Sequence, residues 1–160
     1  MKHSLKIGLS FGLTSGIITT LGLIVGLYTG TGSRIAVLGG ILTIAVADAF
    51  SDALGIHISE ESENIHSSRE IWEATFFTFL AKFISAMTFS LPILLLPLFD
   101  AVVISIFWGL FLLTVFNFYL AKQQKENPFK VISEHLFISL AVIIITYFIG
   151  NWISSVFNTD

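Results

Sequence analysis

The sequence predicts an all-α membrane protein with five transmembrane helices. Hydrophobic residues make up 54% of its 160 residues and charged residues 12%, and the mean hydropathy is +0.87. A soluble domain carries about 25% charged residues, so this composition favours a membrane protein. Five separate apolar segments reach the roughly 20 residues that a helix needs to cross a bilayer. Backbone groups in lipid must be hydrogen-bonded within their own segment, so we expect these segments to be helices.

Composition also excludes several function classes. The chain has no cysteine, which removes disulfides, thiolate metal sites and haem attachment through cysteine. Its net charge of −3 argues against a nucleic-acid partner. We expect no bound cofactor, and we expect the lipid bilayer and a second copy of the chain as partners. The chain carries no targeting extension, which favours a prokaryotic plasma membrane.

The first span, about residues 7–30, follows a basic start and continues too long for a cleaved signal peptide. It is rich in small residues spaced by four, a pattern that lets two helix backbones approach closely. We assign four of these to packing across a homodimer, with a partner helix in the same chain as the alternative: Gly12, Gly16, Gly22 and Gly26.

The other spans are expected at about residues 35–58, 74–98, 101–121 and 131–156, so that residues 1–160 form a single membrane domain. The connection over residues 59–73 is long and acidic. Lysines and arginines mark the cytoplasmic side of a membrane protein. One side would hold Lys2, Lys6, Arg69, Lys122, Lys125 and Lys130, and the other only Arg34. We therefore expect a cytoplasmic N-terminus and an outside C-terminus.

Two aspartates, Asp48 and Asp52, interrupt the second apolar segment. Four residues apart on a helix, they share a face with Cβ atoms about 5–6 Å apart. A charge at bilayer depth costs at least about 2.5–3.5 kcal/mol and usually faces a bundle interior or a water-filled path. Two like charges this close need a cation between them, which a metal, a proton or a lysine can supply.

Lys82 in the third span is the candidate lysine. Counting about 1.5 Å per residue from the cytoplasmic ends places Lys82 about 11–12 Å deep, Asp52 about 9 Å and Asp48 about 15 Å. Lys82 is then either the built-in counter-ion of a metal or proton site, or one half of a purely structural ion pair between spans two and three. A structural pair needs one carboxylate rather than two, which favours the first interpretation.

Neutral oxygen donors and further carboxylates extend this candidate site. Ser15 is a candidate metal ligand, and Thr14, Thr19 and Ser51 are candidates to line a path, with Thr20 close by. The alternative for a hydroxyl in a helix is a hydrogen bond to its own backbone. The acidic connection adds the candidate ligands Glu60, Glu61 and Glu63. Such oxygen-rich clusters suit Mn²⁺, Fe²⁺ or Mg²⁺, and the alternative is a solvated run of charges.

Four stretches resemble a known family. They are "FGLTSGIITTLGLIVGL", "GGILTIAVADAFSDALGIHISEESE", "SLPILLLP" and "TYFIG", in order along nearly the whole chain. They are similar to the vacuolar iron transporter family, the vacuolar iron and manganese transporters of plants and yeast with many prokaryotic members. The resemblance implies a homodimer with a path between protomers lined by spans one and two. It also implies export of Fe²⁺ or Mn²⁺ from the cytoplasm against incoming protons.

The chain departs from this family at its polar positions. Ser15 stands where the family usually has an aspartate, Asp52 where it has a methionine, and Ile56 where it has a glutamate. The long cytoplasmic metal-binding helices of the plant members are absent. The resemblance therefore implies the dimer and the path, but not a preference for iron. In one alternative, the protein is a relative of this family that no longer transports metal and has a structural or regulatory role in the membrane.

A second alternative is a membrane-embedded, metal-dependent phosphotransferase, because D-x-x-x-D in a membrane helix also occurs in CDP-alcohol phosphotransferases. Those enzymes need a further acidic pair and an arginine just upstream, and here the upstream stretch "GSRIAVLGGILTIAVA" has no acid. We therefore do not expect an enzyme.

Overall fold

The computed structural model describes residues 3–157, apart from the side chain of His3, and the described residues form helices joined by short connections. The helices are α1 (His3–Thr31), α2 (Arg34–Ser62), α3 (Ser68–Thr88), α4 (Ser90–Leu95), α5 (Leu98–Gln124) and α6 (Pro128–Phe157). Together they give five segments long and apolar enough to cross a membrane, with α3 and α4 forming one of them. The prediction of an all-helical, multi-pass membrane protein is confirmed at this level.

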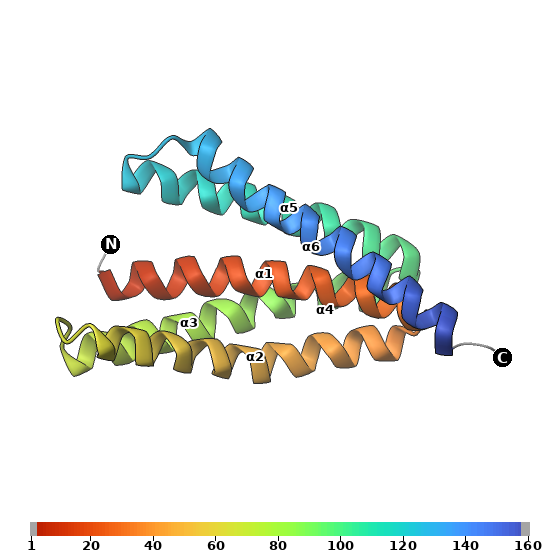
Figure 1. Ribbon diagram of the computed structural model, residues 1–160, viewed down its shortest axis with the longest axis horizontal. Coiled ribbons are helices and arrows are strands. Elements are labelled where there is room, and N and C mark those ends of the chain that lie inside the picture. The colour runs from red at the N-terminus through yellow and green to blue at the C-terminus, as the bar shows by residue number, and fades with distance from the viewer. Residues whose placement is uncertain (1–2, 158–160) are drawn as a thin grey trace.

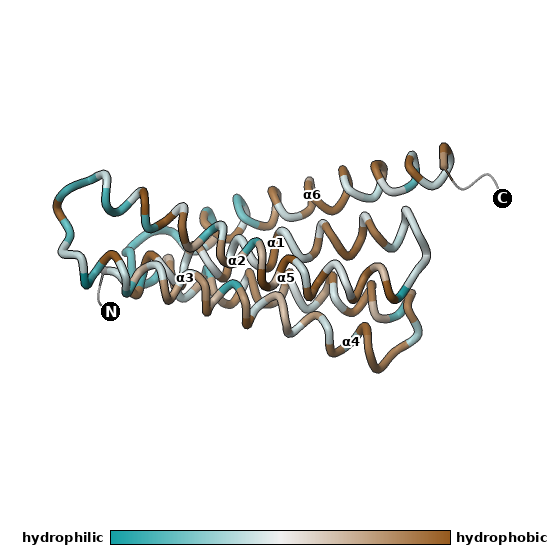
Figure 2. The backbone as a smooth tube through the Cα atoms, turned by 90° about the horizontal axis from the view of Figure 1, so that it is seen from below, coloured by the Kyte–Doolittle hydropathy of each residue, from teal (hydrophilic) through white to brown (hydrophobic). Residues whose placement is uncertain are grey.

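α1 lies at the centre of the molecule (Figure 1). α2 and α3 pack on one side of it, the hairpin of α5 and α6 packs on the other, and the short α4 contacts α5, α2 and α3. The N-terminus, the α2–α3 connection and the α5–α6 connection lie at one end, which we call the N-terminal end of the bundle. Figure 2 shows hydrophilic backbone segments at this same end. The outer surface carries large exposed apolar side chains such as Phe107, Phe137 and Phe148, as a lipid-facing surface requires.

The third span is broken between α3 and α4. Pro92 lacks the N–H that would bond to the carbonyl of Thr88, so the helical ladder is interrupted there. Arg34 then satisfies carbonyls at the end of α4. Its guanidinium donates to the carbonyl oxygens of Ile93 at 2.8 Å and Leu96 at 2.7 Å. The first residue of α2 thus holds the broken span in place.

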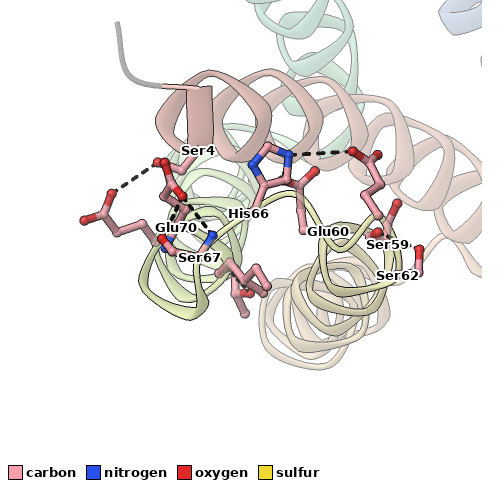
Figure 3. A network of polar contacts seen from close by, with 11 residues as sticks. Ser4, Ser59, Glu60, Ser62, His66, Ser67 and Glu70 are labelled. Carbon is pink, nitrogen blue, oxygen red and sulfur yellow. Dashed lines mark hydrogen bonds and ion pairs between the residues drawn. The ribbon is translucent and has the colours of Figure 1, made fainter.

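The acidic connection is shorter than predicted. α2 continues to Ser62 and α3 begins at Ser68, so only residues 63–67 lie outside helices, not the expected 59–73. Ser67 and Glu70 form a capping box at the start of α3, with the Ser67 N–H donating to Glu70 Oε2 at 2.9 Å (Figure 3). The helices thus extend beyond the apolar segments, because polar residues continue α2 as far as Ser62 and the capping box begins α3.

The glycines of α1 pack within the chain rather than against a second copy. A Cβ atom at Gly12 would lie 2.5 Å from the carbonyl oxygen of Thr78 in α3, and Gly16 also faces α3. A Cβ atom at Gly22 would lie 2.7 Å from Val142 Cγ1 in α6, and Gly26 faces α6 as well. Small residues let two backbones meet wherever the partner comes from. The assignment of Gly12, Gly16, Gly22 and Gly26 to a dimer interface is therefore corrected in favour of the intrachain alternative.

Candidate functional site

Lys82 joins both aspartates and a serine in one polar cluster. Its Nζ lies 2.5 Å from Asp48 Oδ2, forms an ion pair with Asp52 Oδ2 and donates to Ser15 Oγ at 3.0 Å. Ser15 Oγ in turn donates to Asp52 Oδ2 at 2.7 Å. An ammonium has three N–H donors, and these three acceptors match them. We call these four residues the Lys82 cluster. The sequence made Lys82 the candidate partner of the aspartates, and the structure pairs it with both.

Gly12 and Gly16 let α1 pack closely against α3, and this seam between the two helices positions Lys82 to reach α2. A Cβ atom at Gly16 would lie 3.1 Å from both Cα and Cγ of Lys82. A side chain there would push away the alkyl stem of the lysine or separate the two helices. Gly12, one turn earlier, lets α1 approach the backbone of α3. The spacing of these glycines was visible in the sequence, but their role in positioning a lysine was not.

The cluster carries an excess of negative charge. With both aspartates ionised, two carboxylates and one ammonium leave a net charge of −1. Lys82 is buried at 1% exposure, whereas the side chains of Asp48 and Asp52 are 33% and 19% exposed within this single chain. The ammonium is therefore buried, whereas both aspartate side chains remain partly exposed in the single chain. Such an arrangement can accept a further cation.

The hydroxyls of α1 have different fates. Thr19 and Thr20 donate to the carbonyl oxygens of Ser15 and Gly16 in their own helix, at 2.8 and 2.6 Å. This back-bonding is the alternative that the sequence left open for them. Thr19 is exposed, so back-bonding does not remove it from the surface beside the cluster. Thr14 and Ser15 line a cleft towards α5 and α6.

Ser51 lies on the exposed side of α2 and not in the Lys82 cluster. It is flanked on its helix by Asp48, one turn earlier, and by Gly55, one turn later. Ser51 therefore lies one turn from Asp48 on the exposed side of α2.

The carboxylates near the end of α2 form a separate group. Glu60 is buried at 5% exposure, and His66 Nε2 lies 3.6 Å from Glu60 Oε2 and 3.6 Å from Glu63 Oε2 (Figure 3). Glu61 is exposed. Glu60 follows Asp52 by two helical turns, about 12 Å. Over residues 3–157, no group of three or more histidine, aspartate or glutamate side chains is placed to hold one metal ion. The structure thus does not bring Glu60, Glu61 and Glu63 together with Asp48 and Asp52.

Comparison with known protein families and with curated proteins found no match for this chain.

Proposed function

We propose that this protein is a transporter for divalent metal cations of the Fe²⁺ or Mn²⁺ type, and that it exports them from the cytoplasm in exchange for protons. The observation that carries the proposal is the Lys82 cluster. Two carboxylates within a membrane span are costly, and one lysine compensates only one of them. Carboxylate and hydroxyl oxygens are ligands suited to hard divalent cations.

Lys82 supplies a reason for proton coupling. Its ammonium lies where a bound cation would interact with both Asp48 and Asp52. A divalent cation at the two carboxylates repels the ammonium, so the lysine must move away or give up a proton when metal binds. Protons arriving from the outside restore the charge on the lysine or neutralise the aspartates, and the metal is released there. This cycle moves metal out and protons in.

The distribution of basic residues supports a cytoplasmic N-terminal end. The α2–α3 and α5–α6 connections lie at the end where α1 begins. The lysines and arginines that follow α1 and are expected on one side of the membrane lie in or beside these connections: Arg69, Lys122, Lys125 and Lys130. Positive residues favour the cytoplasmic side, so we place the N-terminus inside and the C-terminus outside, in a prokaryotic plasma membrane.

A second copy of the chain is proposed to cover α2. Its exposed side carries a row of small residues spaced by four, Gly39, Thr43, Ala47, Ser51 and Gly55. Nothing lies within 4 Å of a Cβ atom built on Gly39 or Gly55. Rows of this kind support close helix packing in membranes. A homodimer formed here would also cover the accessible side of Asp48 and Asp52, which otherwise faces lipid.

A non-transporting structural or regulatory role is the second candidate. The observation that favours it is again Lys82, because one buried ammonium already engages both aspartates and Ser15. In that case the cluster only joins α1, α2 and α3. The two functions differ in one measurable property, since a structural ion pair needs no exchange with external cations.

Flux measurements in liposomes test the proposal. Purified protein is reconstituted, and fluxes of Fe²⁺, Mn²⁺, Co²⁺ and Mg²⁺ are compared side by side with a pH gradient imposed and removed. The proposal predicts protein-dependent flux of at least one of these ions that responds to the pH gradient. Absence of flux together with absence of saturable metal binding would favour the structural role. Lipid phosphotransferase activity of the purified protein would instead favour a membrane-embedded, metal-dependent phosphotransferase.

A further inference from the structure

A polar cleft lies between α1 and the hairpin of α5 and α6. Its volume is about 580 Å³. Its polar lining includes Ser10, Thr14 and Ser15 on α1, and Glu126, Glu134 and His135 on the hairpin. By contrast, the larger groove beside α4 is lined mainly by apolar side chains, among them Phe83, Met87 and Leu91. We call the first feature the α1–hairpin cleft.

The cleft lies towards the N-terminal end of the bundle. In the opposite half of α1, small residues bring α1 and α6 into direct contact, as a Cβ atom at Gly30 would lie 3.5 Å from Gly150 Cα. Towards the N-terminal end the hairpin diverges from α1 (Figure 1). The α1 residues that line the cleft, from Ser10 to Ser15, belong to this diverging half. The cleft therefore lies on the proposed cytoplasmic side of the molecule.

The hairpin side of the cleft carries groups that accept cations. His135 Nδ1 lies 2.8 Å from the carbonyl oxygen of Val131. A carbonyl only accepts, so Nδ1 carries the hydrogen and Nε2 of the neutral ring keeps its lone pair. Glu126 and Glu134 add two carboxylates. Among the described residues that line the cleft there is no lysine or arginine.

Two buried polar residues lie one turn deeper in the bundle than the cleft lining, one on α5 and one on α6. Asn117 lies one turn from the cleft residue Leu120 on α5, and Ser139 lies one turn from His135 on α6. Both are fully buried, and Asn117 Oδ1 and Ser139 Oγ have no hydrogen-bond partner among the described residues. Buried polar oxygens are usually satisfied, and bound water is the common means where protein groups are lacking. Water reaching this depth would extend the cleft beyond its lining.

Ser15 connects the cleft to the Lys82 cluster. It lines the cleft, and its hydroxyl donates to Asp52 at 2.7 Å and accepts from Lys82 at 3.0 Å. We propose that the α1–hairpin cleft is a water-filled vestibule within each protomer, through which divalent cations reach Ser15 and Asp52 from the N-terminal side. The cation part of this inference rests on the proposed function, and the presence of water in the cleft does not.

Cysteine labelling tests the vestibule, because the chain has no cysteine of its own. Thr14→Cys places a thiol in the cleft, and Val115→Cys places one on the exposed side of α5 at a similar depth. Both variants are treated in lipid nanodiscs with a charged, membrane-impermeant methanethiosulfonate, and labelling is followed by mass spectrometry. Thr14→Cys should react at least about tenfold faster than Val115→Cys, because the reactive thiolate forms in water and not in lipid. Equal rates would overturn the vestibule.

Metal protection tests the cation part. Mn²⁺ should slow labelling of Thr14→Cys, and the slowing should disappear when Glu134→Gln and His135→Gln are added. Labelling that Mn²⁺ leaves unchanged would overturn the assignment of cations to the vestibule. Flux by the wild-type protein is measured in parallel. Flux without fast labelling would overturn the vestibule and leave the proposed function standing, whereas hydration of the cleft without any flux would overturn the proposed function alone.

Discussion

Replacing Lys82 by methionine tests the charge balance of the Lys82 cluster. The substitution keeps an unbranched side chain in the space beside Gly16 and removes the ammonium. Lys82 is 1% exposed and engages Asp48 and Asp52 together. Removing one partner of a buried ion pair costs about 3–5 kcal/mol. Because the aspartate side chains are partly exposed, we expect a loss near the lower value, about 3 kcal/mol.

A loss of that size is measurable by thermal unfolding in nanodiscs. For a chain of this length, about 1 kcal/mol corresponds to about 2–4 °C in Tm, so Lys82→Met should unfold about 6–12 °C below the wild type. The matched control adds Asp48→Asn and Asp52→Asn, which remove the charges that the lysine compensates. In that background Lys82→Met should cost much less.

Divalent cations should partly replace the missing ammonium. Mn²⁺ at about 100 times its Kd stabilises a protein that binds it only when folded by about 2.7 kcal/mol, so it should restore most of the loss in Lys82→Met. No such rescue is expected when both aspartates are asparagines. If Lys82→Met unfolds at the wild-type temperature, or lowers Tm equally in both backgrounds, Lys82 does not compensate the charges of the aspartates.

Three further substitutions separate the packing surfaces. Gly12→Ala should destabilise the folded protomer, measured as a lower Tm, because the added Cβ would lie 2.5 Å from the carbonyl oxygen of Thr78; an unchanged Tm would contradict the close α1–α3 seam. Gly55→Leu should leave the protomer folded, because nothing lies within 4 Å of a Cβ atom there. It should also convert the proposed homodimer to a monomer in light scattering, and a persistent dimer would place the interface elsewhere. Arg34→Gln should lower Tm, because it removes charged hydrogen bonds at 2.7 and 2.8 Å that each contribute about 1.5–3 kcal/mol. An unchanged Tm would show that α4 does not need these hydrogen bonds.

The helical architecture could be read from the sequence because the bilayer imposes it. A segment of about 20 apolar residues has few alternatives to a spanning helix. The ends of the helices were harder to place, since polar residues such as Glu60 and Glu70 continue α2 and begin α3 outside the apolar segments. The break at Pro92 was also missed. Proline is tolerated in membrane helices, and whether it kinks or interrupts one depends on partners such as Arg34.

The candidate site could be predicted in part. Depth along a helix is a linear function of residue number, which is why Lys82 could be matched to Asp48 and Asp52 without a structure. Residue number does not tell which helix packs against a row of small residues. Gly12 meets α3 and Gly22 meets α6, although both belong to the same pattern in one helix. The α1–hairpin cleft was not predicted, because it depends on how α5 and α6 diverge from α1 and not on a local motif.

In the proposed transport function, Asp48 and Asp52 bind the cation that crosses the membrane. The most direct measurement compares Mn²⁺ flux into liposomes that contain equal amounts of folded wild-type protein or of the Asp48→Asn, Asp52→Asn double variant, under the same pH gradient. Asparagine keeps the size of the side chains and removes their charge. We predict that the double variant transports no faster than protein-free liposomes. Flux at the wild-type rate in the double variant would contradict the binding of the transported cation by Asp48 and Asp52.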